Sequence, residues 1–171
     1  VRSAGIPVAG VEAGDDTPAS AANVSADRID GRRRLRWFVL AAIPTGLLTA
    51  VTTFIATDLV SAPLLWVGPL AIYLASFVVA FSRRGGTLVR WATICAPAAA
   101  TLLWVPLGSG GIWPLVPLVA IELGGYAVVA TALHGRLAAD RPTARHLTEF
   151  YLVLALAGVL AGSFVAFVAP T

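Results

Sequence analysis

Five apolar stretches, separated by short polar turns, constrain the fold of this 171-residue chain more than any other feature. Each is close to the roughly 20 residues that an α-helix needs to cross a hydrocarbon core of about 30 Å. A helix is the expected state, because an open sheet would leave backbone groups without hydrogen bonds in lipid. We therefore predict an all-α integral membrane bundle of five transmembrane helices. The predicted spans are Leu35–Thr57, Leu64–Phe81, Leu88–Leu107, Ile112–Leu133 and Leu147–Val168.

The composition agrees with membrane residence. Hydrophobic residues make up 58% of the chain and charged residues only 12%, whereas about a quarter of a water-soluble globular domain is charged. Residues 1–34 show neither a helical nor a strand period. They also have too few apolar side chains to form a core. We expect a disordered cytoplasmic tail over residues 1–34 and one transmembrane domain over residues 35–171.

Arginines supply all twelve basic residues of the chain. They lie near every second connection: before the first predicted span, between the second and third, and between the fourth and fifth. Turns at residues 58–63 and 108–111 carry none. Because basic residues stay on the cytoplasmic side, this pattern predicts a cytoplasmic N-terminus and an outer C-terminus. It also explains the net charge of +3 without nucleic acid. Besides Arg2 in the tail, the groups are Arg28, Arg32, Arg33, Arg34 and Arg36, then Arg83, Arg84 and Arg90, then Arg136, Arg141 and Arg145.

The tryptophans independently mark the ends of the same spans. All five lie within a turn or two of a predicted helix end, as expected of an aromatic belt at the membrane interface. They are Trp37, Trp66, Trp91, Trp104 and Trp113.

The first span has an unusual number of threonines on one face, and Pro44 one turn or more inside it. The hydroxyls lead toward Asp58, beyond the outer end of the span. They would form either a polar path for a ligand or hydrogen bonds back to their own helix. Pro44 is expected to kink the helix or to free a carbonyl. The threonines are Thr45, Thr49, Thr52, Thr53 and Thr57.

Glu122 is an acid near the middle of the fourth span. An ionised carboxylate there costs at least about 2.5–3.5 kcal/mol, so Glu122 must face protein or water, or be neutral. Two interpretations stay open: a functional site, or a neutral packing contact hydrogen-bonded to a neighbour such as the phenol of Tyr126. Gly124 and Gly125 would permit close helix contact there.

The longest polar stretch between two spans, His134–Tyr151, holds the other candidate site residues. A helix starting near Thr143 would place Arg145 four residues before Glu149, and His146 three before it. We expect Arg145 to neutralise Glu149 while the loop joins the ends of two spans. His134, Asp140, His146 and Glu149 lack a recognised metal-ligand spacing, so no metal or other cofactor is expected.

Gly158 and Gly162 form a GxxxG pattern in the fifth span. Small residues four apart let two helix backbones approach closely. The pattern predicts helix packing there.

Two stretches resemble a known family, the bacterial membrane proteins described as spermidine-synthase-like, or as fused transporter and spermidine-synthase proteins. LRWFVLAAIP and TDLVSAPLLWVGPLAIYLASFVVAF, within residues 35–81, resemble the helical hairpin of that family. Residues 134–170, which include RHLTEFYL, resemble its loop and following helix. The sequence departs from the family at Arg136, where an acid is typical, and at Val165, where asparagine is typical.

The resemblance implies the membrane architecture, but not the activity. In the family a soluble aminopropyltransferase domain follows the transmembrane region, and these 171 residues contain no glycine-rich nucleotide loop after a strand. We therefore expect a non-catalytic membrane module, in the lipid bilayer, that packs with itself or with a partner subunit. Two alternatives stay open: a transporter component for a small cation such as a polyamine or proton, or the membrane anchor of a separately encoded aminopropyltransferase.

Overall fold

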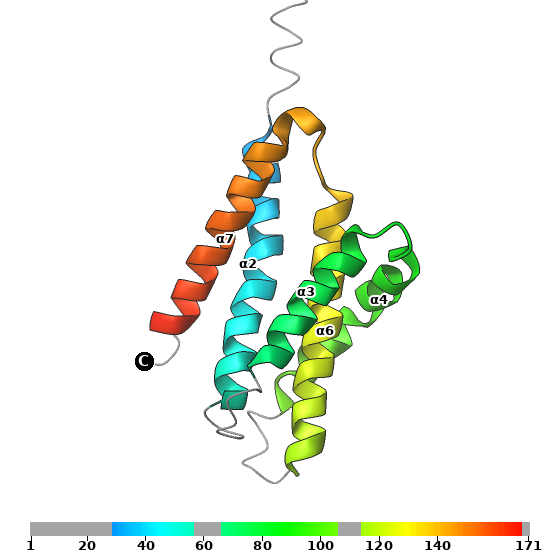
Figure 1. Cartoon of the computed structure of the whole chain (residues 1–171), viewed down its shortest axis with the longest axis vertical. Helices are drawn as coiled ribbons and strands as arrows, with labels where there is room; N and C mark the ends of the chain where they lie inside the picture. Colours follow the sequence, from blue (N-terminus) through cyan, green and yellow to red (C-terminus); the bar gives the residue numbers. More distant parts are fainter. Residues whose placement is uncertain (1–28, 57–65, 106–113, 169–171) are drawn as a thin grey trace, which may run out of the picture. The chain divides into compact units, whose positions relative to one another are not determined.

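The computed structural model describes residues 29–56, 66–105 and 114–168 (Figure 1). The chain divides into two units, Val1–Asp30 and Gly31–Thr171, and every helix below belongs to the second. The described helices are α2 (Gly31–Phe54), α3 (Val67–Phe81), α4 (Gly86–Leu102), α6 (Leu115–Ala139), the short 3₁₀ helix η2 (Ala144–His146) and α7 (Leu147–Phe167). The described ranges contain helices, turns and short connections but no strand, so the all-α prediction is confirmed there.

Three of the helices are long and apolar enough to cross a membrane: α2, α6, and the continuous segment Ala144–Phe167 formed by η2 and α7. The other two are shorter. The 15 residues of α3 rise about 22 Å and the 17 residues of α4 about 25 Å, less than a core of about 30 Å. Membrane residence is thus supported by three spans, rather than by all five predicted ones.

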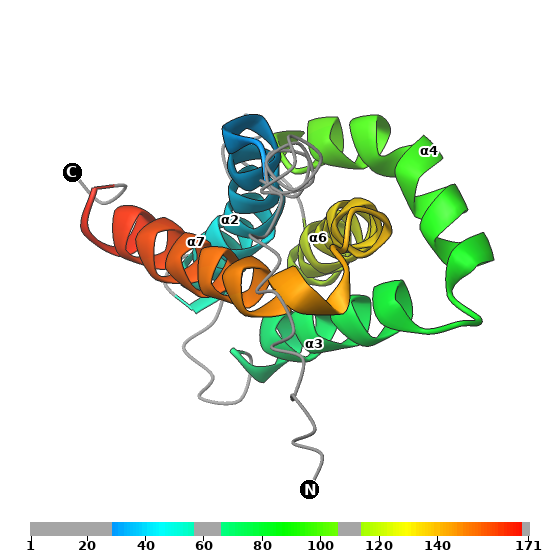
Figure 2. The ribbon, with the colours of Figure 1, turned by 90° about the horizontal axis from the view of Figure 1, so that it is seen from above.

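Helix α6 is the central element of the helical unit. It packs against α2, α3 and α4, which surround it in Figure 2. Two of its glycines allow the contact with α4. A Cβ on Gly125 would lie 3.0 Å from the side chain of Leu103, and a Cβ on Gly135 would collide with the side chain of Val89. The close approach of α4 to α6 therefore depends on the lack of a side chain at Gly135.

The helix that follows α6 packs mainly against the first one. Helix α7 lies along α2, as Figures 1 and 2 both show. At their contact, Gly46 of α2 faces Ala161 and Val165 of α7, and Ala157 is fully buried. Glycine and alanine at this contact bring the two backbones together, which in lipid depends on van der Waals packing.

Helix α2 begins at Gly31, four residues before the start of the predicted first span. Its first turns therefore carry the arginines that the sequence assigned to the tail. Arginine is a good helix former, and acids of other helices hold three of these side chains, as described below. Pro44 lies inside α2, which continues to Phe54. The phenol of Tyr126 donates a hydrogen bond of 3.3 Å to the Pro44 carbonyl, linking α6 to α2.

Candidate functional site

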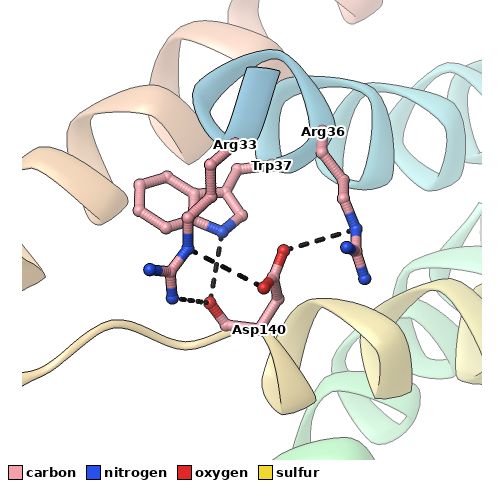
Figure 3. A network of polar contacts seen from close by, with 4 residues as sticks. All are labelled: Arg33, Arg36, Trp37 and Asp140. Carbon is pink, nitrogen blue, oxygen red and sulfur yellow. Dashed lines mark hydrogen bonds and ion pairs between the residues drawn. The ribbon is translucent and has the colours of Figure 1, made fainter. Parts of the chain in front are cut away.

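Polar side chains gather where α2 begins, α6 ends and α7 begins. We call this cluster the junction; it consists of Arg33, Arg34, Arg36, Trp37, Asp140, Glu149 and Phe150. Asp140, the residue after α6, lies between two arginines of α2 (Figure 3). Its carboxylate oxygens are 3.8 Å from Arg33 Nε and 3.3 Å from Arg36 Nε.

The backbone carbonyl of Asp140 is the second acceptor of the junction. Arg33 Nη2 donates to it at 3.1 Å and Trp37 Nε1 at 3.2 Å. A carbonyl at the C-terminal end of a helix lacks an intrahelical donor and carries the negative end of the helix dipole. The two donors from α2 therefore satisfy an acceptor that α6 itself cannot.

Trp37 joins three helices at this point. Its ring is fully buried and meets the ring of Phe150 on α7 edge to face, with centroids 5.1 Å apart. The Arg33 guanidinium lies 5.2 Å from the Trp37 ring centroid, within range of a cation–π contact. Trp37 was predicted to lie in an interfacial belt. In the structure its ring is a buried link between helices, whereas Trp66, Trp91 and Trp104 are exposed; the belt itself stays a prediction.

Glu149 extends the junction to α7. Its carboxylate forms an ion pair with Nε of Arg34 on α2. His146 Nδ1 is 3.9 Å from the other carboxylate oxygen, so the predicted neighbour at i, i+3 is present at long range. The partner expected for Glu149 was Arg145, and that pairing stays a prediction; the described ion pair with Arg34 joins Glu149 to another helix. Thr143 precedes η2, but its side chain makes no capping hydrogen bond.

His134 lies in α6 away from the junction and is fully buried. Its Nδ1 is 2.9 Å from Ser76 Oγ on α3, and Ser76 Oγ also donates to the Tyr73 carbonyl at 2.7 Å. A hydroxyl has one hydrogen, so Nδ1 of His134 is the donor of the bond between them. Rings of Tyr73 and Phe77 enclose the imidazole, at centroid distances of 5.0 and 4.5 Å. Its Nε2 has no hydrogen-bond partner among the described residues.

Glu122 is buried and lines a mostly apolar cavity of about 430 Å³ between α2, α4 and α6. Within the described ranges, the structure gives its carboxyl no hydrogen bond. Tyr126, considered as its donor, bonds to Pro44 instead. Glu122, the junction and the His134–Ser76 pair are therefore separate features rather than one constellation.

The threonines of α2 mainly bond to their own helix. Hydroxyls of Thr45, Thr49 and Thr52 donate to carbonyls four residues earlier, at 2.9, 3.2 and 2.6 Å. Thr45 also lies 3.4 Å from the Tyr73 hydroxyl. The interpretation as helix-internal bonding is thus favoured over a polar path.

The remaining predicted site residues fall in different environments. Gly162 faces Thr49 of α2, with 3.9 Å between an added Cβ and the hydroxyl. A Cβ on Gly158 would meet no atom within 4 Å. Asp58 and Thr57 lie outside the described residues. In the part of the chain that the structure describes, no three His, Cys, Asp or Glu side chains converge as metal ligands do.

Sequence reasoning missed most of the junction. It treated Arg33, Arg34 and Arg36 as topology signals and Trp37 as an interfacial anchor, and it considered Asp140 only as a metal ligand. Partners about a hundred positions apart leave no local spacing signal. The acid directly after α6 is the one clue, since an unpaired carboxylate is unfavourable at a helix C-terminus.

No family model, curated protein or solved structure matches this chain. The fold and the contacts described above therefore carry the functional argument by themselves.

Proposed function

We propose that the chain is a non-catalytic integral membrane module that packs with itself or with a partner subunit. The observation that carries this proposal is the junction. Its acids pair with arginines of another helix, so they hold α2, α6 and α7 together rather than converge on a substrate cavity. His134 is likewise used in packing, through Ser76.

The proposed topology has five spans, with the N-terminus in the cytoplasm of a bacterium and the module in its inner membrane. This topology is supported by the helix ends that carry arginines, because they gather at one end of the helical unit. The junction unites the start of α2 with the end of α6. Near the same end of α6, Gly135 contacts Val89 at the start of α4.

Cysteine labelling in intact cells tests this topology. Single cysteines replace Arg84 or Ser109 in a Cys95→Ser background, and a membrane-impermeant maleimide is added. We expect the reagent to label position 109 and to leave position 84 unlabelled until the membrane is opened. Labelling of both positions in intact cells would contradict five spans.

The assembly part of the proposal concerns the face of α7 that points away from α2. This face carries large apolar side chains, of which Val159 is 66% exposed and Leu152 59% exposed. In a bilayer it meets either lipid or another helix. A Val159→Cys variant in the same background is expected to form a disulfide-linked dimer in oxidised membranes, whereas Ala157→Cys, at a fully buried position, is not. Monomers in both variants would exclude self-association through this face and leave a partner subunit.

A second candidate function is passage of a small cation, favoured by the placement of Glu122 on the wall of the 430 Å³ cavity. A carboxylate there would supply the counter-charge for a proton or a polyamine. Flux into proteoliposomes separates the two functions. Transport by the wild type that is lost in Glu122→Gln supports the cation pathway, and absence of flux in the wild type excludes it.

A further inference from the structure

We propose that the chain binds an anionic phospholipid, with the phosphate against Arg32 and Arg136 and an acyl chain along α2. The site lies in the crevice between α2 and α6, on the side away from the Asp140 contacts with Arg33. The proposed site requires only that these two helices lie in a bilayer. It therefore does not depend on whether the protein assembles with a partner or transports a cation.

The head of the proposed site is a cavity of about 560 Å³. Three of the described residues that line it are arginines, and none is an acid. Arg36 is already paired with Asp140. Arg32 on α2 and Arg136 on α6 are exposed, and the structure describes no ion pair for either of them. Two unneutralised guanidinium groups thus face one cavity from opposite helices, an arrangement that suits the planar, bidentate recognition of phosphate.

The crevice continues from this cavity as an apolar groove. Leu35 and Val39 line the arginine cavity, and Ile43 and Leu47 line the cavity that ends at Glu122. These four residues follow one another at four-residue steps, so they share one face of α2. On α6, Arg136 lines the arginine cavity, and Val129, seven residues or about two turns away, lines the cavity that ends at Glu122. The charged and apolar parts therefore form one continuous surface.

The length of this surface matches one leaflet. Arg32 and Leu47 are about 22 Å apart along α2 at 1.5 Å per residue. Half of a bilayer, including its headgroups, is about 20–22 Å thick. A phospholipid with its phosphate at Arg32 would thus extend its chain as far as Leu47 without reaching past the leaflet. Free phosphate or a soluble polyanion would use only the arginines and leave the groove uncovered.

Lipid retention on the purified full-length protein tests the proposal. The protein is reconstituted with an equal mixture of phosphatidylglycerol and phosphatidylcholine, extracted in mild detergent, and its bound lipids are counted by native mass spectrometry. The test variant is Arg32→Gln/Arg136→Gln, which leaves the Arg36–Asp140 pair intact. The matched control is Arg83→Gln/Arg84→Gln, which removes the same charge from the exposed turn between α3 and α4.

We expect the wild type and the control to retain phosphatidylglycerol in preference to phosphatidylcholine. The test variant should lose this preference, with affinity falling about 25-fold if each arginine near an anionic surface contributes roughly fivefold. Equal losses in the test and control variants would show a general effect of charge and overturn the site. Unchanged retention in the test variant would overturn it as well.

A second arm separates the lipid from its headgroup. Glycerol phosphate, added in excess during extraction, should not displace the retained lipid, because it cannot occupy the groove along Leu35 and Leu47. Complete displacement by glycerol phosphate would show that the arginines bind phosphate without the acyl chain, and would contradict the proposal. Neither experiment depends on dimer formation or on cation flux. Lipid binding can therefore be tested even if either proposed function is wrong.

Discussion

Trp37 on α2 donates its indole N–H to the carbonyl of Asp140, 3.2 Å away and 103 positions later in the chain. The same indole ring packs against Phe150 on α7. One side chain thus contacts the end of α6 and the start of α7. The connection from α6 to η2, Asp140–Thr143, is short. Together with the contacts of Trp37, it fixes the position of α7 relative to α2 at this end.

Replacing Trp37 should destabilise the protein in two steps. Trp37→Phe keeps an aromatic contact with Phe150 but loses the N–H donor, at an expected cost of about 0.5–1.5 kcal/mol. Trp37→Ala also leaves a cavity, at about 3–5 kcal/mol. Unfolding by SDS in mixed micelles measures both. Trp91→Phe, at an exposed site, is the control, and equal effects at positions 37 and 91 would contradict the role of Trp37.

The ion pair between Arg34 and Glu149 predicts a charge-swap result. Arg34→Glu and Glu149→Arg should each lower stability, and the double variant should recover most of the loss. Both side chains are partly exposed, so the coupling free energy should be below about 1 kcal/mol and should shrink as salt is added. A double-mutant cycle measures it. Additive effects of the two substitutions would show that the pair contributes nothing.

Two glycines of α6 should respond to alanine with opposite signs. Gly135→Ala places a methyl group against the stiff, β-branched side chain of Val89, and the overpacking should cost about 1–3 kcal/mol. Gly124→Ala meets open space and should stabilise the helix by roughly 0.5–1 kcal/mol.

The double variant Gly135→Ala/Val89→Ala tests the cause of the first effect. It removes the methyl groups of Val89 and should recover part of the lost stability. If it is no more stable than Gly135→Ala alone, the loss does not arise from the contact between α4 and α6.

Ser76→Ala should destabilise the contact between α3 and α6. It leaves Nδ1 of the buried His134 without its hydrogen-bond partner, at an expected cost of about 1–3 kcal/mol. Ser163→Ala on the exposed side of α7 is the matched control. Thermal unfolding in detergent compares the two. A shift no larger than the control's would mean that water or another group replaces Ser76.

The sequence predicted the helical class well, because lipid leaves few alternatives for a long apolar run. The order and approximate positions of the five described helices follow from the apolar stretches alone. The start of α2 at Gly31 was missed, since arginine favours a helix as readily as an exposed tail. Helix lengths near the turns were also overestimated, as α3 and α4 show; apolar composition does not specify where backbone hydrogen bonding ends.

The contacts between helices were much less predictable. Glu149 was expected to pair with Arg145 because i, i+4 spacing is visible in a sequence. Its ion pair with Arg34, 115 positions earlier, leaves no such signal. The threonine hydroxyls were predictable as helix-internal donors, because that bond needs no distant partner. His134 bonds to Ser76, and no residue spacing indicates that contact. Long-range pairs of this kind depend on the arrangement of the helices, which the apolar pattern does not determine.

The contact between Gly46 on α2 and Val165 on α7 has a consequence for biosynthesis. Val165 is translated 119 residues after Gly46, about 6–24 s later at roughly 5–20 residues per second. Throughout that interval the glycine-containing face of the nascent first helix must be shielded by lipid or by the insertion machinery. A chain whose synthesis stops before α7 would therefore keep lipid at that face in place of its partner helix.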